Sequence, residues 1–303
     1  MNITHPVLAR STAVSAAVIV LVWGFPGASV QASPASSPRP SDLDGGSGPT
    51  LERAQRFFYN GNYERAGAMS QQLCEGHPDD LAACELRSAS LLFQIKQALK
   101  ATGVSDKATA WSQCATCPAF MSKFVAETAR SQTVARARLK AHADDDETLF
   151  FLGKIDLNYV WLQLGTLGHK TGWDEYWEAR RSLDQVLRMN PGHVRARVAR
   201  AWIDYIVGTT VPRGVRWLLG GGNKKRGLLA VREVVAQGGG DFFVQTEARF
   251  ALWDMQVRER DIQEAVSTAR TLARDFPENV ELRTFLADHD PASETTVSGS
   301  ATR

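Results

Sequence analysis

The chain has 303 residues, of which 44% are apolar and 22% are charged, and its formal net charge is only +2. This length suffices for one large domain or two ordinary ones, and the apolar content is normal for a protein with a sizeable core. So small a net charge argues against a general affinity of the whole surface for nucleic acid or membranes, and we expect no nucleic-acid partner.

The first 32 residues have the features of a secretory signal peptide. A polar start with His5 and Arg10 precedes an apolar run over residues 13–25, and small residues lead up to Ala32. The apolar run is shorter than the roughly 20 residues that span a bilayer, so cleavage after Ala32 is favoured over retention as a membrane anchor. We therefore expect an exported protein of the periplasm or cell envelope, with no membrane span after cleavage.

The rest of the chain divides by composition into a helical domain and two flanking segments. Residues 33–50 are crowded with Ser, Pro, Gly and Asp, which cannot bury apolar surface, and are expected to form a disordered linker. Residues 51–287 show helical periodicity, without alternating strand patterns or Asn-Gly hairpins. Residues 288–303, rich in Ser, Thr and Asp, are expected to be a disordered tail. The sequence thus predicts one all-α domain.

A fixed internal spacing recurs within this helical region. In three copies an aromatic or branched residue precedes an alanine by three positions, and a proline follows that alanine by 12. A fourth, weaker copy places Gly227 at the alanine position. A small residue allows two helices to cross closely and proline ends a helix, so each copy predicts a packed helix that then stops. The three copies are Tyr63, Ala66 and Pro78; Tyr176, Ala179 and Pro191; and Ile262, Ala265 and Pro277.

This spacing resembles the tetratricopeptide repeat (TPR) family, whose second helix opens with Gly-x-Tyr-x-x-Ala and ends at a proline. The pair Leu152-Gly153 also matches the Leu-Gly pair of the family's first helix. The resemblance implies a right-handed solenoid of four or five helical hairpins, each covering the apolar face of the previous one. It is weak over residues 101–143. The first helices of the pairs are expected at residues 51–59, 81–99, 147–164, 193–207 and 246–257.

Four cysteines follow the predicted signal peptide, and in an oxidising compartment they favour two disulfides. Cys74 and Cys84 flank the turn at residues 77–80 between two antiparallel helices, which favours their pairing and leaves Cys114 with Cys117. The sequence itself allows three pairings. The alternatives are zinc held by all four cysteines, which lacks a standard ligand spacing, and redox chemistry at the Cys-x-x-Cys pair, which lacks a preceding strand. We expect no metal and no cofactor.

Positive charge is concentrated in residues 179–232. This segment carries twelve Lys or Arg residues and two acidic ones, Asp184 and Asp204, for a local formal charge of +10. Arg197, Arg200 and Asp204 lie at helical spacing on one face, where Arg200 and Asp204 are expected to pair. Most of the charge has no counter-charge nearby in the sequence, which suggests a surface for an acidic partner, a phosphate group or anionic lipid.

Two insertions that the repeat does not require lie in or beside this basic region, at residues 165–172 and 209–222. The flexible glycines that end the second insertion precede a helix, whose N-terminal amides can face an anion, although the spacing is not that of a nucleotide-binding loop. The alternative is that these glycines merely form a turn, while the basic side chains are solvated or meet acids elsewhere. The candidate binding residues are His169, Lys170, Trp173, Arg197, Arg200, Arg213, Arg216, Lys224 and Lys225.

The tryptophans of the helical region are expected to fill gaps between helices, except Trp173, which stands beside the first insertion. The chain contains no nucleophile motif, no HExxH and no Rossmann glycine pattern, so we expect no catalysis. The resemblance implies an exported binding or scaffold protein that recognises a peptide or protein partner. The alternative is a small-ligand-binding accessory protein of a periplasmic solute-uptake system, in which the insertions shape a pocket for a small anion.

Overall fold

The computed structural model describes residues 48–169, 171–238 and 241–290. Within these ranges all regular structure is helical, which confirms the all-α class. The predicted signal peptide, Lys170 and most of the linker and tail lie outside the described residues. The α-helices are α1 (Leu51–Tyr59), α2 (Tyr63–Gly76), α3 (Leu81–Ala101), α4 (Lys107–Gln113), α5 (Cys117–Ala141), α6 (Asp146–Val160), α7 (Trp173–Met189), α8 (Val194–Thr210), α9 (Lys224–Gln237), α10 (Phe242–Glu259), α11 (Ile262–Asp275) and α12 (Val280–His289).

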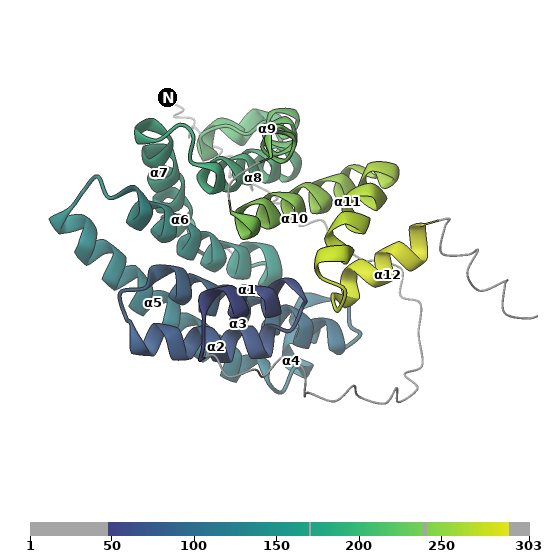
Figure 1. Ribbon diagram of the computed structural model, residues 1–303, viewed down its shortest axis with the longest axis horizontal. Helices are drawn as coiled ribbons and strands as arrows, with labels where there is room; N and C mark the ends of the chain where they lie inside the picture. The colour runs from purple at the N-terminus through teal and green to yellow at the C-terminus, as the bar shows by residue number, and fades with distance from the viewer. Residues whose placement is uncertain (1–47, 170, 239–240, 291–303) are drawn as a thin grey trace, which may run out of the picture.

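Successive helices pack as hairpins along the chain (Figure 1). The pairs are α1 with α2, α3 with α5, α6 with α7, α8 with α9, and α10 with α11, and α12 packs on α11. The region where the repeat pattern is weak forms the pair of α3 and α5, and the short α4 is inserted between these two helices. The π-helix η2 (Trp161–Leu167) continues α6, and the 3-10 helix η3 (Arg213–Leu219) lies between α8 and α9. The predicted fold of stacked helical hairpins is therefore observed.

The small residues of the repeated spacing lie where paired helices cross. Ala66, Ala179 and Ala265 are completely buried. At Gly227 in α9, an added Cβ would lie 2.5 Å from the carbonyl oxygen of Ala201 in α8. Even a methyl group is too large at that crossing, which explains why the fourth copy has glycine instead of alanine. The helices α2, α7 and α11 each end two residues before the proline of their copy.

The last helices of the domain return to the first one (Figure 1). The Asn279 side chain, which caps α12, donates a hydrogen bond of 2.7 Å from Nδ2 to the backbone oxygen of Tyr59 at the end of α1. The Tyr59 ring lies 5.2 Å from the Phe250 ring and 5.5 Å from the Phe276 ring, measured between centroids. Because Phe250 belongs to α10 and Phe276 follows α11, an aromatic cluster joins the two ends of the helical arc.

A trio of charged side chains connects three hairpins inside this arc. Glu247 of α10 accepts hydrogen bonds from Lys154 of α6 at 2.6 Å and from Arg195 of α8 at 2.8 Å. Burial by itself would raise the pKa of Glu247, but the two cations outweigh it and lower the pKa to about 2. Glu247 is therefore ionised at neutral pH, and its charge is balanced within the fold.

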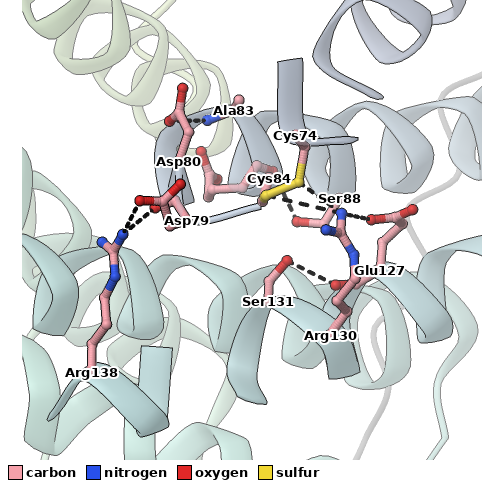
Figure 2. Close-up of a disulfide and its surroundings, with 11 residues drawn as sticks. Cys74, Asp79, Asp80, Ala83, Cys84, Ser88, Glu127, Arg130, Ser131 and Arg138 are labelled. Atoms are coloured by element: carbon pink, nitrogen blue, oxygen red, sulfur yellow. Dashed lines mark hydrogen bonds and ion pairs between the residues drawn. A yellow bond between two sulfur atoms is a disulfide. The ribbon is translucent and has the colours of Figure 1, made fainter. Parts of the chain in front are cut away.

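Two disulfides stabilise the first half of the domain, and Figure 2 shows the first of them, between Cys74 and Cys84. Cys74 of α2 is joined to Cys84 of α3, with their Cα atoms 5.2 Å apart, and Cys114 is joined to Cys117 at the start of α5, with a Cα separation of 5.4 Å. These are the pairings that the sequence favoured. The Arg130 side chain of α5 reaches the first bridge, with Nη2 2.7 Å from Sγ of Cys74.

Replacing Cys74 and Cys84 together with alanine is expected to lower the free energy of unfolding by about 2–3 kcal/mol, because their bridge closes a loop in the unfolded chain. Urea denaturation of the oxidised protein measures this loss. The matched control removes Cys114 and Cys117, whose sequence separation is 3 rather than 10, and should lose roughly 1–2 kcal/mol. Equal losses in the two variants would contradict the loop-closure explanation.

Among the described helices, none combines the length and apolar character needed to cross a lipid bilayer. The ordered chain also differs slightly from the predicted boundaries. The side chain of Thr50 caps α1, and α12 continues to His289, inside the segment predicted as a tail.

Candidate functional site

The second insertion folds as η3 and is tied to the hairpins on either side of it. Arg216 donates hydrogen bonds from Nε to the carbonyl oxygen of Val211 at 2.7 Å and from Nη2 to that of Gly208 at 2.6 Å. The Tyr176 hydroxyl of α7 donates to the carbonyl oxygen of Leu219 at 2.8 Å. These contacts fix the middle and the end of η3 against α8 and α7.

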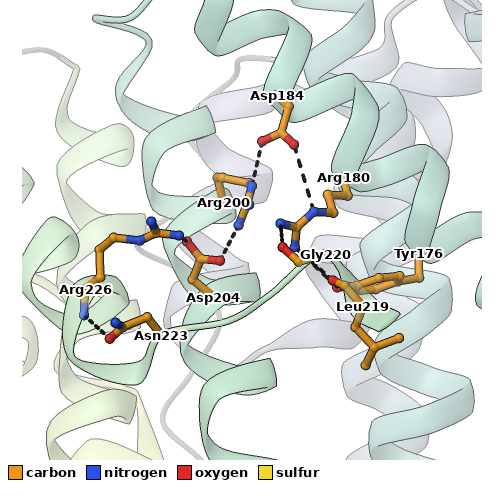
Figure 3. A network of polar contacts seen from close by, with 9 residues as sticks. All are labelled: Tyr176, Arg180, Asp184, Arg200, Asp204, Leu219, Gly220, Asn223 and Arg226. Atoms are coloured by element: carbon orange, nitrogen blue, oxygen red, sulfur yellow. Dashed lines mark hydrogen bonds and ion pairs between the residues drawn. The ribbon is translucent and has the colours of Figure 1, made fainter. Parts of the chain in front are cut away.

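Arg180 of α7 holds the turn that follows η3 (Figure 3). Its guanidinium donates to the carbonyl oxygens of Leu219 and Gly220. Gly220 has a positive φ of 72°, and an added Cβ there would lie 2.7 Å from Nε of Arg180. Glycine is required at this position for both reasons. The turn at the start of the glycine run is therefore packed in place, whereas the sequence suggested flexible glycines.

A hollow of about 530 Å³ opens between the end of α8, η3 and the start of α9. Four of its lining residues are cationic and none is acidic, and all four cations are candidates from the sequence. The structure therefore brings together residues from both sides of the glycine run. The lining residues are Gly208, Thr209, Arg213, Arg216, Gly222, Asn223, Lys224 and Lys225.

The four cations differ in how far the fold already uses them. Arg216 is bound to backbone carbonyls, and Nζ of Lys224 lies 2.7 Å from the Glu259 carboxylate of α10. Arg213 and Lys225 are exposed, and no ion pair joins either of them to an acid in the described part of the chain. Burial would raise the pKa of Glu259, but hydrogen bonds from Lys224 and Tyr205 outweigh it and lower that pKa. Arg213 and Lys225 are thus the cations most accessible to a ligand.

The backbone adds to the positive potential of the hollow. Asn223 caps α9, with its side-chain oxygen accepting a hydrogen bond of 3.0 Å from the backbone nitrogen of Arg226. The helix therefore begins at the hollow, where its dipole favours negative charge. An added Cβ at Gly208 would strike the backbone nitrogen of Lys224, so glycine in α8 allows the start of α9 to approach this closely.

Arg200 and Arg197, two other candidates, are paired within the fold. Arg200 lies between Asp184 at 2.6 Å and Asp204 at 2.7 Å, and the second of these pairs is the one that the sequence predicted (Figure 3). Arg197 of α8 donates a hydrogen bond of 3.1 Å to Gln237 of α9. The alternative interpretation, in which basic side chains meet acids elsewhere in the fold, describes Arg200, Arg197, which lies 3.9 Å from Glu233, and Lys224. For Arg200 and Arg197 it favours a structural role.

The first insertion packs near α4, and none of its described residues lines the hollow. Nζ of Lys107 donates a hydrogen bond of 2.8 Å to the carbonyl oxygen of Gly165, and Nδ1 of His169 lies 2.8 Å from the side-chain oxygen of Gln163. Trp173 at the start of α7 is 41% exposed, in keeping with its expected exception from the core. Neither His169 nor Trp173 lines the hollow.

One tryptophan that was expected in the core is exposed instead. Trp217 of η3 is 72% exposed, and its neighbours Leu218 and Val215 are 53% and 42% exposed. The prediction for Trp217 was wrong because η3 is an insertion with no buried residue, so no helix covers it. Trp217 belongs to an insertion and not to a repeat helix, and this position in the sequence could have predicted its exposure.

A second hollow, of about 570 Å³, lies at α11 and α12, but its chemistry is less distinctive. One of its two arginines, Arg270, is paired with Asp290. No group of three or more His, Cys, Asp or Glu side chains that could hold a metal ion occurs among the described residues. The hollow at η3 is therefore our candidate site.

No family model matches this chain, and no curated protein matches it. Among solved structures, the chain is similar to the crystal structure of a thermophilic TPR protein in Thermus thermophilus. The TM-score is 0.43 and the sequence identity 14%, over 79% of this chain and 96% of that one.

Proposed function

We propose that this protein is an exported binding protein that captures an acidic segment of a peptide or protein partner in the hollow between η3 and α9. The observation that carries the proposal is the convergence of four cations, with no carboxylate among the lining residues. Complementary charge at an interface guides association and fixes register. The repeated spacing resembles that of the TPR family, which implies recognition of a peptide or protein.

The proposed site lies at the end of α8, at η3 and at the start of α9. The side chains of the Glu247 trio and of the aromatic cluster around Tyr59 already contact one another, and none of them lines the hollow. The hollow at η3 is open to solvent and has exposed cations. A ligand can reach it without any rearrangement of the helices.

Export is part of the same proposal. The signal-like first 32 residues support it, and so do the two disulfides, since such bridges persist in oxidising compartments outside the cytosol. The periplasm or cell envelope is the proposed location.

A small anionic ligand is the second candidate, in a protein that assists solute uptake. The hollow's volume of about 530 Å³ falls within the roughly 300–1,000 Å³ that is usual for small-molecule sites, and this observation favours it. Both candidate functions use the same cations but different ligands. Comparing the affinities for an acidic peptide and for a small anion therefore distinguishes between them.

Reversing the charge of the two most exposed cations, with Arg213→Glu and Lys225→Glu together, is expected to weaken binding of an acidic peptide at least tenfold. The physical reason is that two attractions become repulsions, and a tenfold loss corresponds to about 1.4 kcal/mol. Fluorescence anisotropy with a labelled oligoglutamate peptide measures the affinity, and binding should weaken as salt is added.

The matched control places the same charge change elsewhere, with Arg181→Glu and Arg188→Glu on the exposed side of α7. The control should bind as the wild type does. Equal losses in both variants would show that only overall charge matters and would refute the site. Competition by inorganic phosphate at equal or lower concentration than the peptide would favour the small-anion candidate.

A further inference from the structure

The 3-10 helix η3 presents an apolar surface next to the cationic hollow. Val215, Trp217 and Leu218 are each more than two-fifths exposed, and they stand within seven residues that also supply Arg213 and Arg216. Three exposed large apolar side chains in one short element contribute little to the stability of the isolated fold. Such a cluster at the surface marks an interaction site.

The three-residue period of a 3-10 helix separates these side chains from the cations. Arg213 and Arg216 share one side of η3, which lines the hollow, and Val215 and Leu218 share another. Trp217 follows Arg216 directly and lies on the third side, so apolar side chains flank the cationic side of η3 in both directions. A ligand in the hollow therefore has apolar surface beside it.

Internal hydrogen bonds hold this surface in one conformation. The backbone nitrogen of Gly221 donates to the carbonyl oxygen of Arg216 at 2.9 Å, and that of Val215 donates to the carbonyl oxygen of Pro212 at 3.1 Å. The Trp217 indole nitrogen donates to the carbonyl oxygen of Gly214 at 3.1 Å, which fixes the ring. A surface that is ordered before binding loses little conformational entropy when a partner docks. Tryptophan is also among the residues that contribute most binding energy at interfaces.

We propose that Val215, Trp217 and Leu218 form the second half of the binding surface, and that the partner is a peptide segment with a large aliphatic or aromatic side chain next to its carboxylates. This inference rests on the proposed function, because the carboxylates are the groups that enter the hollow. It adds a second requirement, since an acidic segment without the apolar side chain binds only through charge.

The shape of the site favours a peptide over an anionic membrane. Arg216 and Lys224 are only partly exposed and line a hollow, where a flat bilayer surface cannot reach them. A protruding chain segment can place a carboxylate there and lay the neighbouring side chain on Trp217. The positive charge and the concave shape of the site therefore both favour a polypeptide as the ligand.

Selection of a random displayed-peptide library on the immobilised purified protein tests this inference. We expect the enriched peptides to contain several acidic residues and one large apolar residue near them. Synthetic versions should bind at least tenfold more weakly after Trp217→Ser and Leu218→Ser together. Val280→Ser on α12, which is 62% exposed and distant in sequence from η3, is the matched control and should leave affinity unchanged.

A second arm uses each selected peptide with its apolar residue replaced by serine. Its loss of affinity on the wild type should disappear on the Trp217→Ser, Leu218→Ser variant, because the two groups then act as one pair in a double-mutant cycle. Since both protein substitutions are at exposed positions, an unchanged thermal unfolding midpoint will show that the fold is intact.

Four outcomes overturn the inference. If the enriched acidic peptides lack an apolar residue and bind the Trp217→Ser, Leu218→Ser variant as tightly as the wild type, the proposed function stands and only the inference is refuted. Failure to enrich acidic peptides, or indifference of the enriched ones to Arg213→Glu and Lys225→Glu, would remove both. Binding to phosphatidylglycerol vesicles that depends on Trp217, without peptide binding, would assign the surface to a membrane.

Discussion

Replacing Glu247 with glutamine is expected to lower the free energy of unfolding by about 3–5 kcal/mol, because it removes the carboxylate that pairs with both Lys154 and Arg195 and leaves only the weaker influence of Glu85 on these cations. The side chains of the trio are between 15% and 23% exposed, so water reaches them only partly. The remaining glutamine side chain is neutral and can accept hydrogen bonds, but it does not balance two buried positive charges.

Denaturant unfolding monitored by circular dichroism measures this loss. Glu264→Gln on the exposed side of α11 is the matched control and should change stability by no more than about 0.5 kcal/mol. A triple variant with Lys154→Met, Arg195→Met and Glu247→Leu should recover most of the stability, because it removes all three charges together. A loss below about 1 kcal/mol for Glu247→Gln would contradict the proposed role of the trio.

The same residue predicts a pH dependence. The pKa of Glu247 is about 2 in the folded protein, below its ordinary value, so the folded state binds this proton less readily than the unfolded chain does. Its contribution to stability is fully present above the ordinary glutamate pKa of about 4.3 and declines as the pH falls toward 2. Between these values, the Glu247→Gln variant should lose less stability than the wild type.

Replacing Phe276 with alanine is expected to lower the free energy of unfolding by about 3–5 kcal/mol, as is typical for a fully buried aromatic residue. The Phe276 ring contacts the rings of Tyr59, Phe250 and Phe242. Its loss leaves a cavity at the place where the end of the arc meets α1. Phe242→Ala, at a residue that is 39% exposed, is the matched control and should lose less stability.

Hydrogen exchange then locates the effect of Phe276→Ala. If the aromatic cluster holds the first and last hairpins together, the amides of α1 should exchange faster in the variant, although Tyr59 and Phe276 are far apart in the sequence. Unchanged protection of α1 relative to the protection of α6 would contradict this closing role.

The fold was predictable because its signals are local. Ala66 and Pro78 lie within one helix and the turn that follows it, so their spacing can be read without knowledge of the partner helix. The Glu247 trio has no such signal, since Lys154 and Arg195 lie 93 and 52 residues away. Ion pairs of this kind depend on how hairpins stack, which periodicity does not encode.

The candidate site was predictable in part for the same reason. Arg213, Arg216, Lys224 and Lys225 stand close together in the sequence, and a single turn brings them to one hollow. Arg200 does not line the hollow and pairs with Asp204, as the sequence predicted, and also with Asp184 of α7 in the preceding hairpin, which the sequence pattern did not indicate. The apolar side of η3 was missed because composition alone assigns tryptophan to the interior.

The contact between the two ends of the helical arc sets the size of this domain. In an open array of repeats, each unit interacts only with its neighbours, so units can be added or lost at the ends and the stability changes stepwise. Here a duplicated hairpin would move Phe276 away from Tyr59 and cost the molecule a contact that no neighbour replaces. Loss of the last hairpin would likewise uncover α1. The domain should therefore unfold in one cooperative transition. The contact between its first and last hairpins fixes the number of hairpins, whereas in an open array that number can vary with the size of the binding surface.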